Sequence, residues 1–339
     1  MNNRLYLPEG WLNLETVENL DADFIFVFGG RGIGKTYGME ERIDHAHRGE
    51  CFFMRRTRAE WDIITDERMN MFATYNADNG TAFHFRTEKG IARIMDGDEY
   101  IGLSAPLSTF SNLRGFDNFG DINIMYYDEF IPERHKAKIR NEHEVFLNVY
   151  ESINRNRELK GRKSVKCVCF ANANDIKNPL FVGLNLVTMA EQMKRKEKEI
   201  LINSKRRVAL VDCCYSPISK KKAETALYRM AGDTSDFYSM AIKNNFNSPL
   251  MPSVSRPLIE YKPLVTVGEI CIYQHKSNGK FYVTTTISKT APNFPANDTQ
   301  LEIFRLRYGR LYDEFYSLRV EFESNICQIL FLTYFKMIS

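Results

Sequence analysis

The sequence predicts an α/β protein with a parallel sheet, followed by a smaller α+β region. Short apolar runs alternate with helical segments, the runs have the length of buried parallel strands, and polar residues follow several of them. The 339 residues suffice for two domains. Hydrophobic residues make up 44% and charged residues 26%, and the net charge is only +3. These values are typical of a globular protein in which any basic patch is local.

The first half of the predicted parallel sheet begins with two strands, each followed by a helix. Residues 22–29 form an apolar run that ends in glycine, and residues 35–49 follow as a helix. Residues 50–56 are a second buried strand. Residues 57–72 are predicted as a helix, because they begin with a threonine N-cap and a glutamate three residues later, which is a capping box.

The next predicted elements lead to two polar strand ends. Residues 81–108 contain strand-like runs interrupted by Lys-Gly and Asp-Gly pairs, which indicate two hairpin turns. Residues 122–130 are a buried strand with acids at its end, and residues 142–159 are helical. Residues 164–174 are a strand that ends in asparagines.

The composition changes after this strand. From Glu191 to Lys222 there are ten Lys/Arg and four Asp/Glu, which indicates either a linker or a solvated charged face. We therefore predict an α/β domain over residues 1–190, a basic helical linker over 191–230, and an α+β domain over 231–339. The last domain is expected to hold short strands and a final helix from Thr299 onward.

Cysteines and apolar runs indicate the cellular setting. The seven cysteines include no C-x-x-C pair, so we expect reduced, mostly buried thiols in a reducing compartment. The N-terminus does not have the pattern of a signal peptide. The longest late apolar run, residues 326–335, is too short to span a bilayer and is predicted as the last core element.

The stretch FVFGGRGIGKT matches the phosphate-loop pattern G-x-x-x-x-G-K-[ST] between a strand and a helix. Glycine backbone lets consecutive N–H groups surround phosphate oxygens, and the helix N-terminus adds a positive dipole. Lys35 is expected to contact the β- and γ-phosphates, and Thr36 to ligate Mg²⁺. The predicted nucleotide-binding residues are Gly29, Gly30, Arg31, Gly32, Ile33, Gly34, Lys35 and Thr36. The predicted cofactors are ATP and Mg²⁺.

The strand over residues 122–130 supplies the second half of a nucleotide-hydrolysing site. Asp128 ends the apolar run and is expected to hold Mg²⁺, while Glu129 is placed to polarise the attacking water. The phosphate-loop strand and this Walker B strand need not be neighbours, an arrangement expected of the ASCE division of P-loop ATPases. In that division, a polar residue at the end of the next strand senses the γ-phosphate. We prefer Asn172 over Asn174, because it directly follows the apolar run.

Several segments together resemble one family. GGRGIGKT, MRRTRAE, YYDEF followed by I-x-E, NRNRE and CFANAN-x-x-x-NP are similar to the DNA-packaging ATPases of φ29-like tailed bacteriophages, over roughly residues 20 to 185. The resemblance implies a motor that couples ATP hydrolysis to translocation of double-stranded DNA into the prohead. It also implies a homopentameric ring at the portal vertex, in the host cytoplasm and transiently on the prohead.

The resemblance also implies an arginine finger that acts in trans. Positive charge on the transition state often comes from a neighbouring subunit in ring ATPases. Arg155 is the finger by resemblance, and Arg157 is the alternative, because only one of the two is expected to face the partner site.

Other basic residues are assigned to subunit, nucleotide or DNA contacts. In the family, the region of Arg55, Arg56 and Arg58 forms part of a lid over the nucleotide and contacts the neighbour. Arg31 is assigned either to sensing of the nucleotide state or to a subunit contact. DNA contact is expected to involve phosphates only, since a packaging motor must pass any sequence. The candidates are the loop over residues 107–121, with Arg114, and the clusters over residues 194–222.

The family's C-terminal domain resembles an RNase H-type nuclease that has lost its metal ligands. It serves in docking and nucleic-acid binding, in some members for a structural packaging RNA. Two-metal nucleases need several convergent acids, whereas the acids here are scattered: Asp233, Asp236, Glu260, Glu269, Asp313 and Glu314. We therefore expect no nuclease activity.

Two other hypotheses remain open at this point. One is a different ASCE nucleic-acid enzyme, either a helicase or a terminase with an active nuclease. A helicase would carry paired motor domains or further motifs, and the sequence shows one phosphate loop. The other is a scaffold protein without turnover, against which an intact Lys35, Thr36, Asp128 and Glu129 argue.

Overall fold

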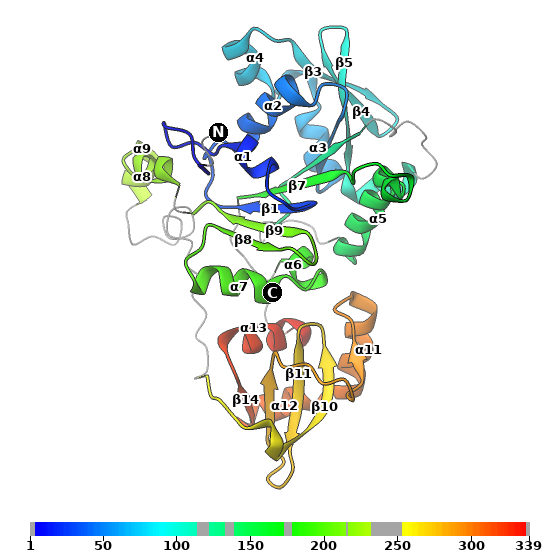
Figure 1. Ribbon diagram of the computed structural model, residues 1–339, viewed down its shortest axis with the longest axis vertical. Coiled ribbons are helices and arrows are strands. Elements are labelled where there is room, and N and C mark those ends of the chain that lie inside the picture. Colours follow the sequence, from blue (N-terminus) through cyan, green and yellow to red (C-terminus); the bar gives the residue numbers. More distant parts are fainter. Residues whose placement is uncertain are drawn as a thin grey trace. The chain divides into compact units, whose positions relative to one another are not determined.

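The computed structural model describes residues 4–113, 122–132, 139–172, 178–214, 216–231 and 253–336. The chain forms two compact units. The first comprises Met1–Lys138, Val145–Asn174 and Glu197–Asn245, and the second comprises Ile139–Glu144, Asp175–Lys196 and Phe246–Ser339. Figure 1 shows the elements of both units.

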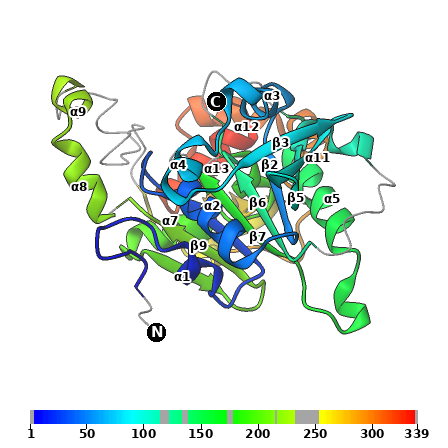
Figure 2. The same cartoon turned by 90° about the horizontal axis from the view of Figure 1, so that it is seen from above.

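The first unit is built on a nine-stranded sheet with the order β3-β4-β5-β2-β6-β7-β1-β9-β8. The six strands from β5 to β9 in this order are mutually parallel, and β3, β4 and β8 are antiparallel to their neighbours. Figure 2 shows β2, β6 and β7 side by side. The strands are β1 (Phe24–Phe28), β2 (Cys51–Arg55), β3 (Phe83–Glu88), β4 (Ile91–Asp96), β5 (Glu99–Pro106), β6 (Ile124–Asp128), β7 (Lys166–Ala171), β8 (Ile200–Asn203) and β9 (Val208–Asp212). The predicted parallel α/β sheet and both hairpins are confirmed.

The central strands are apolar on both faces because helices cover both. Successive side chains of a strand point to opposite faces. On one face, Ile25 and Val27 of β1 share a core with Met39 and Ile43 of helix α2 (Lys35–Ala46). On the other, Phe24 packs edge-on against Phe146 of helix α5 (Glu142–Asn154). This two-sided burial explains the unbroken apolar run that precedes the phosphate loop.

The other helices of this unit are shorter than the sequence indicated. The capping box is confirmed, but its helix α3 (Arg58–Ile64) ends early, and a 3₁₀ turn, Glu67–Met69, and α4 (Ala73–Asn79) follow. The helix predicted over 142–159 ends at Asn154, before a 3₁₀ turn, Arg157–Lys160. The remaining helices are α1 (Leu14–Glu18), a 3₁₀ helix (Leu107–Leu113), α8 (Pro217–Ala223) and α9 (Ala226–Ala231).

The predicted basic linker differs most from the structure. Residues 191–230 contain β8 and β9, and β9 pairs in parallel with β1 from Phe24↔Val208 to Phe28↔Asp212. The run Val208–Asp212 is buried throughout, and the lysines and arginines around it lie in turns and helices. In the sequence, the many flanking lysines and arginines obscured the signal of this five-residue strand. The linker prediction was therefore wrong for β8 and β9.

The second unit is α+β, as predicted for the C-terminal part of the chain, but its bounds differ from the predicted 231–339, because it also takes in Ile139–Glu144 and Asp175–Lys196. Its sheet has the order β13-β10-β11-β12-β14, with antiparallel pairs in the centre and parallel pairs at both edges. The predicted single final helix is instead three helices and a strand (Figure 1). The elements are α6 (Pro179–Gly183), α7 (Val187–Arg195), a 3₁₀ turn (Leu258–Glu260), β10 (Tyr261–Val267), β11 (Ile270–His275), β12 (Phe281–Thr284), β13 (Asn293–Phe294), α11 (Asp298–Tyr308), α12 (Arg310–Tyr316), β14 (Val320–Phe322) and α13 (Asn325–Tyr334).

The late apolar run forms α13, which packs on β11 and β12 as a core element. Within the described ranges, no helix has the length and apolar character needed to cross a membrane. All seven cysteines are free, and all except Cys214 are buried.

Candidate active site

The phosphate loop joins the carboxyl end of β1 to the first turn of α2. Gly34 is the N-cap of α2 and has φ +94°, a left-handed conformation that glycine adopts without steric cost. The loop contacts the N-terminal segment, since the Leu12 N–H donates to the Ile33 carbonyl over 3.0 Å. The sequence pattern therefore folds as the strand, loop and helix that a phosphate site requires.

Lys35 is buried at the start of α2, with 5% of its surface exposed. Its ammonium donates to the carbonyls of Gly29 and Gly30, over 3.1 and 2.8 Å. Burial lowers the pKa of Lys35 to about 8, and the nearby Lys222 lowers it as well, while Asp128 acts in the opposite direction. A buried ammonium whose hydrogen bonds, among the described residues, go to neutral carbonyls is a strong potential partner for an anion.

Asp128 and Glu129 lie at the end of β6, two strands from β1. In the sheet, β7 lies between β6 and β1, whereas β2 lies on the other side of β6. Asp128 is buried, and its carboxylate accepts the backbone N–H of Glu129 over 3.0 Å. Glu129 has φ +58°, which is uncommon for a residue with a side chain. The parallel strands thus bring the lysine and both acids to one edge of the sheet.

Asn172 follows the last residue of β7, the strand between β1 and β6. It is half-buried, and Ala171 before it is in register with Phe28 of β1. Thr36, also half-buried, is the second residue of α2. Asn174, the alternative to Asn172, lies outside the described residues.

Arg55 binds both acids of the Walker B strand. It is the last residue of β2 and is directly in register with Asp128. Its guanidinium lies 3.0 Å from the Asp128 carboxylate and 2.8 Å from that of Glu129. Burial acts to lower the pKa of Arg55, but the two acids outweigh burial and raise the pKa above its ordinary value. Its Nε has no hydrogen-bond partner within the described part of the chain.

The three arginines that were grouped as a lid occupy different environments. Arg56 is fully buried. Arg58 pairs with Asp62 over 2.7 Å and lies 4.8 Å above the Trp61 ring. Arg55 faces the acids of its own subunit. Whether any of them contacts a neighbouring subunit stays a prediction.

Glu40 is a site residue that the sequence analysis missed. It lies one helical turn after Thr36, with 3% of its surface exposed. Burial, and then Asp128, raise its pKa to about 8. Its Oε1 makes no hydrogen bond among the residues described. The signal that was available is the four-residue spacing from Thr36, which puts both side chains on one helix face.

The two finger candidates are clearly different. Arg155 is exposed, at the break after α5, with φ +47°. Its Nε donates to the Ser152 carbonyl over 3.3 Å. Arg157 is 4% exposed and donates to the Asn123 side chain over 2.9 Å. Arg155 is therefore on the surface, and Arg157 belongs to the interior of its own unit.

The basic clusters over residues 194–222 lie in different elements. Lys194 is in α7, residues 205–207 form the turn between β8 and β9, and Lys221 and Lys222 are in α8. Arg207 pairs with Asp21 and Asp23. Arg114 and the loop over 114–121 lie outside the described residues.

Comparison with known proteins places this chain in a family. The sequence model of the podovirus DNA encapsidation protein (Gp16) matches residues 6–256. The chain belongs to this family. The DNA packaging proteins of Bacillus phages phi29 and B103 are 30% and 33% identical to it, over 190 and 186 residues. These matches cover 54% and 52% of this chain and 50% and 52% of the relatives, so the chain spans about half the length of the curated relatives it matches.

Solved structures of similar fold extend further along the chain. The bacteriophage Phi-29 viral genome packaging motor assembly matches with a TM-score of 0.59 and 17% identity, over 98% of this chain and 99% of that one. The Phi-28 gp11 DNA packaging motor matches with a TM-score of 0.57 and 18% identity, over 98% and 100%. At these identities the likeness establishes the fold. The predicted relation of the second unit to an RNase H-type nuclease stays a prediction.

Proposed function

We propose that this encapsidation-family protein is an ATP-driven motor that translocates double-stranded viral DNA into a prohead. The observation that supports it most directly is the convergence of Lys35, Asp128 and Glu129 at one edge of the parallel sheet. Ligands bind at the carboxyl ends of the strands in such folds. The packaging proteins and motors to which the chain is similar act on viral genomes, and they supply the expected substrate.

In this proposal, the phosphate loop binds the nucleotide through backbone N–H groups from Gly29 to Thr36. Lys35 exchanges its bonds to the Gly29 and Gly30 carbonyls for β- and γ-phosphate oxygens. That exchange gives the buried ammonium charged partners, which form stronger hydrogen bonds than carbonyls do.

The residues present fit a magnesium ion. Mg²⁺ prefers oxygen ligands, and the Thr36 hydroxyl and the buried Asp128 carboxylate are the proposed ligands. The Oε1 of buried Glu40, which has no hydrogen-bond partner among the described residues, adds a further oxygen to the same region. When bound, the ion neutralises charge on the phosphates. Glu129 orients and polarises the attacking water, and Arg55 fixes the direction of its carboxylate.

The remaining roles depend on assembly. We assign Asn172 to sensing of the γ-phosphate, and Arg155 to the active site of the neighbouring subunit in a homopentameric ring at the portal vertex. The exposure of Arg155 and the burial of Arg157 support this choice. DNA contact through phosphates, a packaging RNA as partner, and action in the host cytoplasm and on the prohead belong to the same proposal.

We also propose that the second unit has no nuclease activity. Two of the described acids that the sequence singled out, Glu269 and Glu314, have structural partners. Glu269 accepts the N–H groups of Val187 and Thr188 at the start of α7, both over 3.1 Å. Glu314 pairs with Arg319 over 3.0 Å. Asp233 and Asp236 lie outside the described residues.

ATP hydrolysis with and without long double-stranded DNA tests the motor proposal. Wild type should hydrolyse ATP faster with DNA, Glu129→Gln should be nearly inactive, and Glu88→Gln, an exposed carboxylate in the β3–β4 hairpin, should match wild type. Plasmid DNA incubated in parallel with Mn²⁺ should stay intact. Absence of hydrolysis by wild type on DNA and on assembled proheads would contradict the proposal, and plasmid cleavage would favour a terminase.

A further inference from the structure

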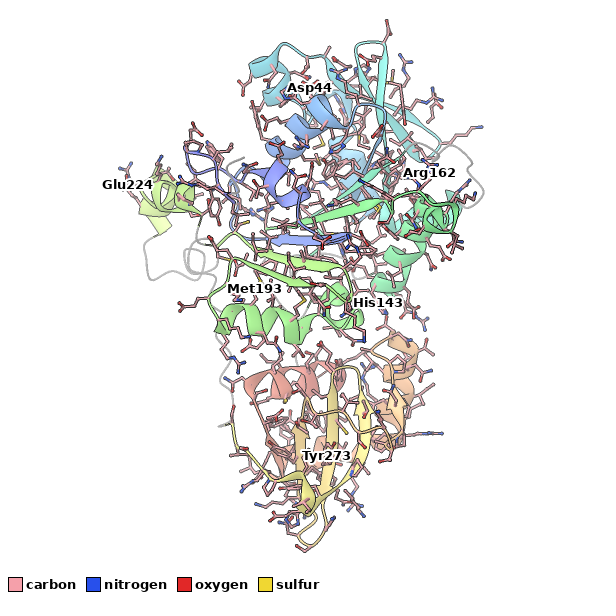
Figure 3. All side chains as sticks on the ribbon, viewed as in Figure 1. Asp44, His143, Arg162, Met193, Glu224 and Tyr273 are labelled. Carbon is pink, nitrogen blue, oxygen red and sulfur yellow. The ribbon has the colours of Figure 1, made fainter. Side chains whose placement is uncertain are left out.

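Helix α8 lies beside the N-terminal segment of the first unit. In Figures 1 and 2 this short helix projects next to that segment, and Glu224, which follows it, is labelled in Figure 3. The Ser216 hydroxyl donates to the Gly10 carbonyl over 2.9 Å, and Lys221 donates to the Glu9 carbonyl over 3.2 Å. Because β9 precedes it directly and is in register with β1, α8 starts from the same sheet edge as the phosphate loop.

Lys222, at the end of this helix, reaches the phosphate loop. Its ammonium donates a hydrogen bond to the carbonyl of Arg31. A Cβ atom on Gly32, which has φ +62°, would lie 2.7 Å from the same ammonium. The side chain of Lys222 is therefore in close contact with the middle of the loop, and the absence of a side chain at position 32 makes that contact possible.

Two ammonium groups are thus directed at one loop. Lys35 bonds to the Gly29 and Gly30 carbonyls inside it, and Lys222 bonds to the next carbonyl. Burial lowers the pKa of Lys222, and Lys222 contributes to the lowered pKa of Lys35. Two like charges near each other repel, and a polyphosphate bound between them would offset that repulsion.

We propose that Lys222 is a second phosphate-binding lysine, whose ammonium moves from the Arg31 carbonyl to an oxygen of the polyphosphate of a bound nucleoside di- or triphosphate. This inference rests on the proposed nucleotide binding and extends it to a residue 187 positions after Lys35. It makes Lys222, near the end of α8, part of the nucleotide site. Lys222 is a binding residue here, and the water-activating role stays with Glu129.

A purely structural role for Lys222 predicts a different result when the side chain is replaced. If Lys222 only braced the loop, any side chain that donates to the Arg31 carbonyl would serve. Lys222→Gln still carries a donor and lacks the charge, so it separates bracing from phosphate binding. Lys221→Ala is the matched control, because it also removes one lysine from this helix. The native Lys221 side chain contacts the Glu9 carbonyl and not the phosphate loop.

The experiment is calorimetric titration of the full chain with Mg²⁺ and the non-hydrolysable analogue AMP-PNP. We expect Lys222→Ala and Lys222→Gln to raise Kd about ten-fold, the loss of one charge-assisted hydrogen bond, with Lys221→Ala within two-fold of wild type. Melting temperatures without nucleotide should be equal for Lys222→Gln and wild type.

Three results separate the possible failures. If wild type and Lys221→Ala bind AMP-PNP and Lys222→Gln binds it equally well, the inference on Lys222 is overturned and the nucleotide site stands. If Lys222→Gln keeps AMP-PNP affinity and loses affinity for a long DNA duplex, the lysine is a DNA contact, which also overturns the inference. If wild type itself does not bind AMP-PNP, the proposed function fails first.

Discussion

Acidic side chains do different work in the two units. In the second unit three described acids have a local partner: Glu269 caps α7, Glu314 pairs with Arg319, and Glu321 pairs with Arg256 over 2.7 Å. In the first unit, acids gather at one sheet edge. Glu129 has a left-handed backbone, Glu40 has an oxygen without a hydrogen bond among the described residues, and one arginine serves both Asp128 and Glu129.

The difference separates acids that stabilise the fold from acids that are poised for a ligand. A helix cap or a surface ion pair stabilises the fold by about 1 kcal/mol or less, and both of its partners belong to the chain itself. A buried carboxylate without a partner lowers stability and persists when the site gains function from it. A buried carboxylate oxygen without a hydrogen bond among the described residues therefore marks the site better than acidic composition does, since both units contain scattered acids.

The largest expected effect comes from breaking the first cluster directly. Lys35→Ala and Glu129→Gln should each lower ATP hydrolysis by about a thousand-fold, because one removes the phosphate ligand and the other the water-orienting carboxylate. Glu321→Gln, which removes a carboxylate from the second unit, should leave the rate unchanged. Steady-state hydrolysis under DNA-stimulated conditions measures all three. Equal losses in all three variants would contradict the division between the units.

Arg55 tests whether the shared arginine orients Glu129. Arg55→Ala should lower kcat about ten- to a hundred-fold and change KM little, because its contacts within the described part of the chain go to the two acids and not to the phosphate loop. Separate kcat and KM values from initial rates give the answer. A variant that hydrolyses like wild type, or that changes KM alone, would show that the pairing has no catalytic part.

Glu40 allows the comparison to be tested through the pH dependence of stability. Its pKa is about 8 in the folded chain, against an ordinary value of 4.5, so the folded state holds a proton that the unfolded state releases between these values. Stability from this group is present below pH 4.5 and is lost as pH rises through 8. Glu40→Gln should therefore gain stability over wild type across this window, on the order of a few kcal/mol.

Denaturant unfolding at several pH values measures the Glu40 effect. Glu41→Gln, the exposed neighbour in the same helix, is the control and should follow wild type at every pH. Parallel curves for wild type and Glu40→Gln would show that Glu40 is not held neutral.

The smallest effect is expected in the second unit. Glu269→Ala removes the acceptor of two N–H groups at the start of α7 and should cost about 1 kcal/mol of unfolding free energy. ATP hydrolysis per folded molecule should not change. Chemical unfolding and hydrolysis on the same preparation test both parts, and a specific loss of hydrolysis would assign Glu269 to function.

The sequence predicted the parts of the site that are local in the chain. The phosphate loop follows from a fixed spacing, and Asp128 with Glu129 follows from an apolar strand that ends in acids. Arg55 was singled out, but its pairing depends on the register between β2 and β6, which no local pattern encodes. Lys222 lies far from the loop in sequence, inside a basic cluster that was predicted as a linker. β9 was missed because only four apolar residues, Val208 to Val211, stood among stronger charge signals.

The most direct test of the motor account is to mix two inactive variants. Glu129→Gln lacks the water-polarising carboxylate, and Arg155→Ala lacks the exposed arginine proposed to act on the neighbouring subunit. Each alone should hydrolyse ATP weakly on DNA-engaged proheads, and the mixture should recover part of the activity, because some interfaces join an intact Glu129 to an intact Arg155. Full activity of Arg155→Ala alone, or no recovery on mixing, would contradict a finger that acts between subunits.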